Sequence, residues 1–392
     1  MKKQAWQLER EMRDAEVPVD RRKEASRWMK GDTEFPHGDE LLRWNWNVKV
    51  PGSLALDVFF QSMVQDWANQ GYDVSEAEEL IPVGRALEAA NNLVDLRVVS
   101  ARIWKALREA PKIEGHPYHQ YEHPVEWESV RAAMPAAADK HPLSVWQANY
   151  PERILQGWIG QLAGGSFGTA IEGYTGPQIA GVYGEVRSYV TQPETTNDDV
   201  VYELLLLDVY EKMGKGITSD ALADEWVHQL PYGVSAEGIA LRNLNMGIYP
   251  PDSGTFLNPY CDWIGAQIRA DLYGWVCPGR PALAAELARR DASLSHRGDG
   301  VHAAAFVAAL AAALPASADL DTALDMALAE IPAHSGAADG VRFGRSIAGT
   351  ADAVTRLHLH YRELTPLHAV NNLALVVWAL RAHAGDFSAT VG

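Results

Sequence analysis

The chain lacks several features that would define a protein class on their own. Its 392 residues contain only two cysteines, Cys261 and Cys277, which excludes both a disulfide framework and a zinc site built from four cysteines. Lys and Arg number 34 against 51 Asp and Glu, so the formal net charge is −17. A surface of that sign attracts neither a phosphate backbone nor an anionic membrane. We therefore expect no nucleic-acid partner and no membrane partner.

Long apolar runs are also missing. The N-terminal segment is charged through Lys30 and has no apolar core of the kind that a secretory signal needs. The longest apolar run, residues 301–314, ends at Pro315 and is shorter than the ~20 residues that cross a bilayer. It predicts a buried helix. Together with the scarcity of cysteine, this favours a reduced, cytoplasmic setting.

Helical periodicity is frequent, whereas alternating strand patterns are scarce. Apolar spacing predicts helices over residues 53–71 and 87–101 in the first third of the chain. Further helices are predicted over residues 152–163, 200–213, 219–230, 280–291, 300–314, 320–331 and 368–384. This pattern indicates an all-α orthogonal helical bundle rather than a βαβ fold.

The helical segments are separated by a stretch with no sustained period. Residues 132–151 are rich in Ala and Pro, and we place a domain boundary there, near residue 145. The prediction is an N-terminal helical domain of unknown role over residues 1–145 and a second helical domain over residues 146–392. Two domains agree with the length of the chain.

A Gly-x-Ser-x-Gly pattern occurs at Gly164–Gly168. In serine hydrolases this pattern forms a sharp turn between a strand and a helix, which exposes the serine side chain. The residues before it have helical spacing, so we predict a glycine-rich turn from helix to loop. A serine hydrolase that uses Ser166 is the weakest alternative.

Acidic and amide side chains follow this turn at two places. Glu172 comes directly after it, and Asn197, Asp198 and Asp199 precede an apolar helix. Asn and Asp at such a position can cap the free N–H groups of a helix. Their oxygens can also converge on a hard cation. The local sequence leaves both interpretations open.

The remaining candidate ligands have simpler interpretations. His116, His119 and His123 alternate with prolines, which favours a loop with solvated histidines over a metal site. Cys261 and Cys277 are expected to be small buried residues.

Several segments, taken in chain order, resemble the ADP-ribosylglycohydrolase family, which includes dinitrogenase reductase-activating glycohydrolases. Residues 153–173 look like its opening helix and Gly-Asp-x-x-Gly-x-x-x-Glu turn, and residues 196–199 look like its Thr-Asp-Asp metal motif. Residues 258–260, 265–269 and 295–296 resemble the central region, and residues 371–380 resemble a late helix. The resemblance runs from about Pro151 to the C-terminus.

The resemblance implies a chemistry for the acidic residues. Asp198 and Asp199 would be Mg²⁺ ligands for one or two ions, and Asn197 stands at the position of the ligating Thr. Glu172 matches the loop glutamate that acts in catalysis in some members. The implied activity is Mg²⁺-dependent hydrolysis of an ADP-ribosyl or other N-ribosyl bond. Arg187 and Arg269 are candidate counter-charges for a phosphorylated substrate.

The chain departs from the family pattern at three places. Gly165 replaces the Asp of the Gly-Asp turn, and Asn197 replaces the Thr. No Gly-Gly-Asp-x-Asp motif follows the late helix before Gly392, so we expect the domain to be C-terminally incomplete and its second metal site uncertain. The alternatives are an N-glycosidase for a nucleoside metabolite and a catalytically inactive ligand-binding or scaffold protein. The sequence does not predict an oligomeric state.

Overall fold

A computed structural model describes residues 4–18, 34–121, 123–124, 127–135, 149–193 and 197–391. The chain is 66% helical and has almost no strand, so the all-α prediction is confirmed. The domain boundary predicted near residue 145 lies outside the described residues.

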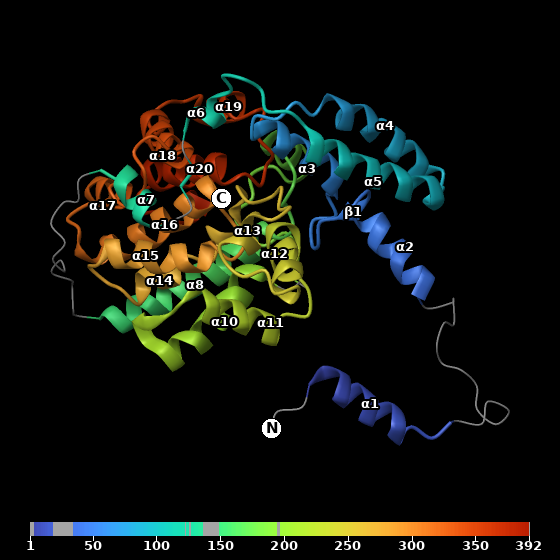
Figure 1. The fold of residues 1–392 in the computed structure, drawn as a ribbon. Helices are drawn as coiled ribbons and strands as arrows, with labels where there is room; N and C mark the ends of the chain where they lie inside the picture. The colour runs from blue at the N-terminus through green and yellow to red at the C-terminus, as the bar shows by residue number, and fades with distance from the viewer. Residues whose placement is uncertain are drawn as a thin grey trace.

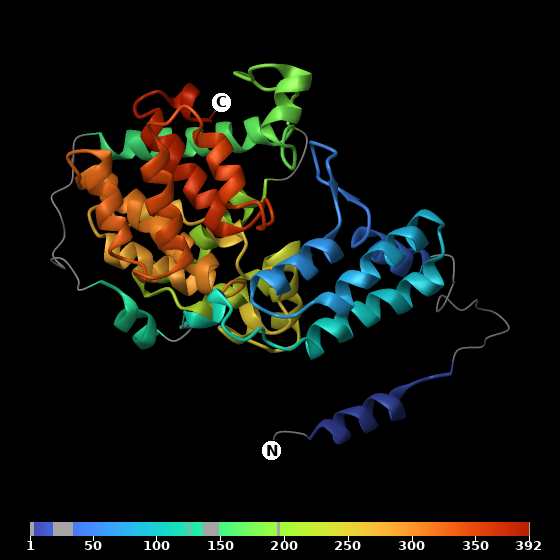
Figure 2. The ribbon, with the colours of Figure 1, turned by 90° about the horizontal axis from the view of Figure 1, so that it is seen from above.

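The N-terminal region contains seven helices and one short hairpin among its described residues. They are α1 (Ala5–Ala15), α2 (Glu34–Trp44), β1 (Val48–Lys49), β2 (Leu56–Asp57), α3 (Phe59–Asn69), α4 (Ser75–Ala89), α5 (Leu93–Glu109), α6 (Pro117–Gln120) and α7 (Trp127–Ala133). The strands pair antiparallel, Val48 opposite Asp57. Figure 2 shows α4 and α5 side by side, next to the larger helical region.

The rest of the chain is helical in its described residues. Its helices are α8 (Tyr150–Gly168), α9 (Gly176–Tyr183), α10 (Asp198–Met213), η1 (Gly214–Gly216), α11 (Ser219–Gln229), α12 (Ser235–Asn245), α13 (Asp252–Thr255), η2 (Ile264–Ala266), α14 (Asp271–Trp275), α15 (Pro281–Ala292), α16 (Gly298–Ala313), η3 (Leu314–Ala316), α17 (Leu320–Leu328), α18 (Gly336–Ile347), α19 (Ala353–His360), α20 (Ala369–Ala382) and α21 (Phe387–Val391).

Helix α16 is the centre of the bundle. It contacts α14, α15, α17, α18 and α20, and it is labelled among several of them in Figure 1. Its alanines let neighbouring helices approach closely, because a methyl side chain adds little width. Among the described residues, the stretch Gly298–Ala316 is the one helix long and apolar enough to cross a membrane, but 72% of its apolar window is buried inside the protein. This is the burial of a core helix, as the sequence predicted.

Three local predictions were wrong. Residues 87–101 do not form one helix, because Asn91 has a φ of 55° and the Asn92 side chain caps a new helix, α5. Helix α3 begins at Phe59, and Ser53 lies in the hairpin loop. The strands were missed because two residues are too few to show alternation.

The N-terminal region and the family-like region share a hydrophobic cluster. Trp46 stacks on Phe60 with ring centroids 4.9 Å apart, and both belong to a cluster that includes Tyr260 and Trp263 from the second half of the chain. The Trp263 indole donates a hydrogen bond to the buried Asp66 carboxylate at 2.5 Å. The two regions are therefore packed against each other through apolar and polar contacts.

Candidate active site

Helices α8 and α10 meet at the glycines of the predicted turn. Helix α8 continues to Gly168, so Ser166 is helical and the predicted turn at Gly164–Gly168 is wrong. A side chain at Gly165 would begin only 2.5 Å from Asn197 Nδ2 and 3.5 Å from Asp199 Oδ2. The glycine therefore leaves the space that the Asn197 amide occupies. The strand-to-helix elbow of a serine nucleophile is not formed here.

Helix α10 begins with the acidic pair. Asn197 is the N-cap residue, and its Oδ1 accepts a hydrogen bond from the Val200 N–H at 3.4 Å. Asp198 and Asp199 fill the first turn, where the positive end of the helix dipole favours negative charge. The local sequence left capping and cation binding open. In the structure Asn197 caps the helix, and the two aspartates interact with backbone N–H groups of the first turn.

Three predicted site carboxylates lie close together. Glu172 lies on the exposed turn after α8, where partial burial, Asp198 and Asp57 raise its pKa. Burial and then Asp198, Asp271 and Glu172 raise the pKa of Asp199 to about 7. Burial is the larger cause in both cases, and the remaining part of each shift comes from the neighbouring carboxylates. The structure thus brings Glu172, Asp198 and Asp199 into one acidic cluster.

Two further acids lie behind this cluster and were missed by the sequence analysis. Glu203 is fully buried on α10, and neither of its carboxylate oxygens has a hydrogen-bond partner within the described residues. Burial and the neighbouring Asp271 carboxyl raise its pKa. A glutamate within the apolar run 200–207 was the available signal, because glutamate is rarely buried without a specific reason.

Arg269 is a buried residue that hydrogen-bonds to three side chains near the site. Its Nη1 donates to Glu237 Oε1 at 2.7 Å, its Nε donates to Asp291 Oδ2 at 2.7 Å, and its Nη2 donates to Ser295 Oγ at 3.0 Å. The guanidinium is 2% exposed. Because its donors are already engaged inside the protein, Arg269 does not offer a counter-charge to a substrate phosphate. Burial and then Glu237 raise the pKa of Asp198, so this network reaches the acidic cluster.

The N-terminal hairpin reaches the turn that carries Glu172. A side chain at Gly173 would begin 2.9 Å from the Ala55 methyl group, and the Tyr174 hydroxyl donates to the Ser53 carbonyl at 3.1 Å. The turn therefore rests on the N-terminal region, although the family resemblance begins only near residue 151.

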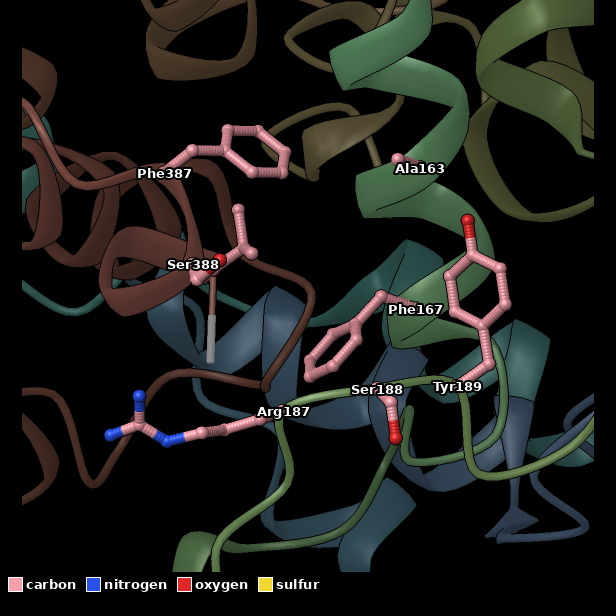
Figure 3. Close-up of a pocket in the computed structure, with 8 residues that line it drawn as sticks. Ala163, Phe167, Arg187, Ser188, Tyr189, Phe387 and Ser388 are labelled. Atoms are coloured by element: carbon pink, nitrogen blue, oxygen red, sulfur yellow. The ribbon is translucent and has the colours of Figure 1, made fainter.

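A pocket of about 280 Å³ opens beside the C-terminal half of α8. Figure 3 shows the rings of Phe167, Tyr189 and Phe387 around it, with the Arg187 side chain extending away from the rings. Arg187 forms an exposed ion pair with Glu185 at 2.5 Å. None of the three site carboxylates lines this pocket.

The histidines of the first third are only partly solvated, and each has a partner inside the protein, which the prediction of a solvated loop did not foresee. His116 Nδ1 accepts a hydrogen bond from the Tyr118 N–H at 3.2 Å, and His119 Nε2 lies 2.9 Å from the Gly71 carbonyl oxygen. His123 stacks on Tyr118 with ring centroids 3.9 Å apart. All three are half-buried structural residues. Both cysteines are buried, as predicted.

The acidic cluster has the donor chemistry for Mg²⁺. Among the residues that the structure describes, no group of three His, Cys, Asp or Glu side chains is arranged to hold a metal ion. Mg²⁺, however, is usually bound by one or two carboxylates and keeps several waters. Asp198 and Asp199 fit that requirement, whereas the Asn197 oxygen is already used in the helix cap.

The fold and the site define an all-α protein with an acidic cluster at the start of a helix that has one buried face. A family model described as ADP-ribosylglycohydrolase matches residues 146–391, more than half of the chain. The chain belongs to the ADP-ribosylglycohydrolase family. No match was found among curated proteins or solved structures. Membership suggests glycosyl hydrolase activity and implies an ADP-ribosylated substrate.

Proposed function

We propose that this chain is a Mg²⁺-dependent hydrolase that cleaves an ADP-ribosyl or other N-ribosyl bond. The observation that carries the proposal is the meeting of Glu172, Asp198 and Asp199 at the junction of α8 and α10. These are the positions at which the family pattern places its loop glutamate and its first metal motif.

The chemistry of ribosyl transfer suits such a cluster. Cleavage passes through an oxocarbenium-like state, whose positive charge is stabilised by nearby carboxylates. Asp198 and Asp199 would hold Mg²⁺, which when bound supplies orientation of ribose hydroxyls and of a water molecule. Glu172 lies on the exposed side of the cluster, where its carboxyl can hold or move a proton. Its raised pKa brings that group nearer to neutral pH, where acid–base catalysis works best.

The test is release of ADP-ribose from an ADP-ribosylated protein, followed by chromatography. We expect turnover that EDTA removes and Mg²⁺ restores, and a loss of at least roughly a hundredfold in Asp198→Asn and Asp199→Asn. Asp208→Asn is the matched control, because Asp208 lies on the same helix but is exposed and bonded to Gln229. Equal losses in all three variants would contradict the assignment.

Two alternatives remain distinguishable by the same assay. Turnover of a nucleoside, without release of ADP-ribose from protein, would identify an N-glycosidase for a small metabolite. Absence of Mg²⁺ binding by calorimetry, together with absence of turnover on every substrate, would identify an inactive ligand-binding or scaffold protein.

A further inference from the structure

A second pocket, of about 250 Å³, lies where the N-terminal region meets α15 and α16. Pro124 and Trp127 form one wall, and Arg289, Arg290 and Arg297 line it from the other side. Figure 1 shows α7, which begins at Trp127, beside α15 and α16. Three arginines around one small pocket are unexpected in a chain whose net charge is −17.

Arg289 is a buried cation that no acid in the described part of the chain pairs with. Its side chain is 7% exposed, and its guanidinium lies over the Trp127 ring at 5.2 Å from the ring centroid. Among the described residues its polar neighbours are His302, whose Nδ1 is 3.5 Å from Nη1, and Tyr121. No carboxylate of the described residues forms an ion pair with it. Burial lowers its pKa to about 10, which reflects the cost of holding an uncompensated charge.

Arg297 adds a second guanidinium, which forms no ion pair within 4 Å among the described residues but is attracted by the nearby Asp262 carboxylate. Its Nη2 donates to the Gln70 side chain at 2.8 Å, and its buried Nε has no hydrogen-bond partner there. Arg290 differs, because it pairs with Glu286 at 2.5 Å. The one acid lining the pocket is thereby paired, and Arg289 is left as the lining arginine on which no described carboxylate acts.

The N-terminus of α16 lies at the same pocket. Its N-cap residue, Arg297, makes no side-chain cap, and Gly298 lines the cavity. The positive end of this 16-residue helix adds to the field of Arg289, and Asp299 in its first turn offsets part of that field. A tetrahedral oxyanion would balance the unpaired charge of Arg289 and accept the planar donor pattern of its guanidinium.

We propose that this pocket binds a phosphate group, either as inorganic phosphate or as the terminal phosphate of a small ester. The pocket is independent of the proposed active site, because Glu172, Asp198 and Asp199 do not line it. Bound phosphate would link Trp127 of the N-terminal region to α15 and α16 of the family domain. This gives the N-terminal region a role in ligand binding.

The test uses the full chain with inorganic phosphate and with glycerol 3-phosphate. Binding is measured by calorimetry and by thermal unfolding, and NaCl at matched ionic strength is the control. We expect saturable binding of at least one phosphate compound and a rise in melting temperature that NaCl does not reproduce. Tighter binding of glycerol 3-phosphate would identify an ester as the ligand, and tighter binding of inorganic phosphate would identify the free ion.

Arg289→Met should weaken that binding at least roughly tenfold, the usual value of one charge-assisted hydrogen bond. Without phosphate, this variant should melt no lower than the parent protein, because an unpaired buried charge has been removed. Arg102→Met, on the exposed face of α5, is the control and should change neither quantity.

A melting shift equal to that of NaCl, or unchanged affinity in Arg289→Met, would overturn the proposal. If Arg289→Met does not fold, Arg297→Gln replaces it in the test, because its amide can still donate toward Gln70. We expect phosphate binding to weaken in this variant as well. Unchanged phosphate affinity in that second variant would overturn the proposal equally.

Discussion

Replacing Arg269 by methionine should destabilise the protein strongly. The guanidinium donates to Glu237 and Asp291 at 2.7 Å each, and both carboxylates are nearly fully buried. The substitution would leave two buried acids without a cation, and breaking buried ion pairs in this way costs about 3–5 kcal/mol. Loss of the guanidinium contacts with Tyr202 and Trp226, each at 5.0 Å, adds to that cost.

Chemical denaturation of the parent protein and Arg269→Met would measure this difference in unfolding free energy. The triple variant Arg269→Met with Glu237→Gln and Asp291→Asn should recover part of the loss, because it removes the stranded charges as well. The unfolding free energy of Arg269→Lys should lie between those of the parent protein and Arg269→Met, because one ammonium cannot replace three directed donors. A cost below about 1 kcal/mol for Arg269→Met would refute the reasoning, because it would place the network in the range of exposed ion pairs.

Three further predictions concern packing, protonation and thiol reactivity. Gly344→Ala should lower the unfolding free energy by more than about 2 kcal/mol, because its methyl group would lie 2.4 Å from the Ala374 carbonyl oxygen. The control is Gly181→Ala, whose methyl group would enter open space and should leave stability unchanged or raise it. Asp299 is buried with a pKa raised to about 7, so the folded state holds more protons than the unfolded one and stability should fall as pH rises from about 4 to 7. Asp299→Asn should flatten that part of the pH profile, and a slope of the same size in this variant would contradict the assignment. Because both cysteines are buried and burial raises the pKa of Cys261 to about 12, a thiol reagent at pH 8 should label the protein only after denaturation; rapid labelling of the native protein would contradict this.

The fold was predictable where one helix face is buried and the other exposed. The predicted helices over residues 200–213, 219–230 and 280–291 agree with α10, α11 and α15 within two residues at each end. The prediction failed at Gly164–Gly168, because glycine was taken as a sign of a loop. In the structure glycine at 165 is required by the close approach of Asn197, which only the tertiary contact reveals.

The candidate site was predictable in part for a similar reason. Glu172, Asp198 and Asp199 lie in segments with a recognisable order along the chain, and the structure places them near one another. Glu203 and Asp271 could not be found in this way, because they come together only when α14 packs near α10. Arg269 was expected to face a substrate, but its burial among Glu237 and Asp291 depends on contacts between distant segments.

The two departures from the family pattern at this site are physically linked. The resemblance puts Gly165 at the position of the family's Asp and Asn197 at the position of its Thr. An aspartate at 165 would extend into the volume of the Asn197 amide, whose Nδ2 lies 2.5 Å from the first side-chain atom. Glycine in place of aspartate at 165 also removes one negative charge beside Asp199. The pKa of Asp199 is already raised by burial and by its acidic neighbours. The pair therefore keeps the space between α8 and α10 filled while lowering the repulsion within the acidic cluster.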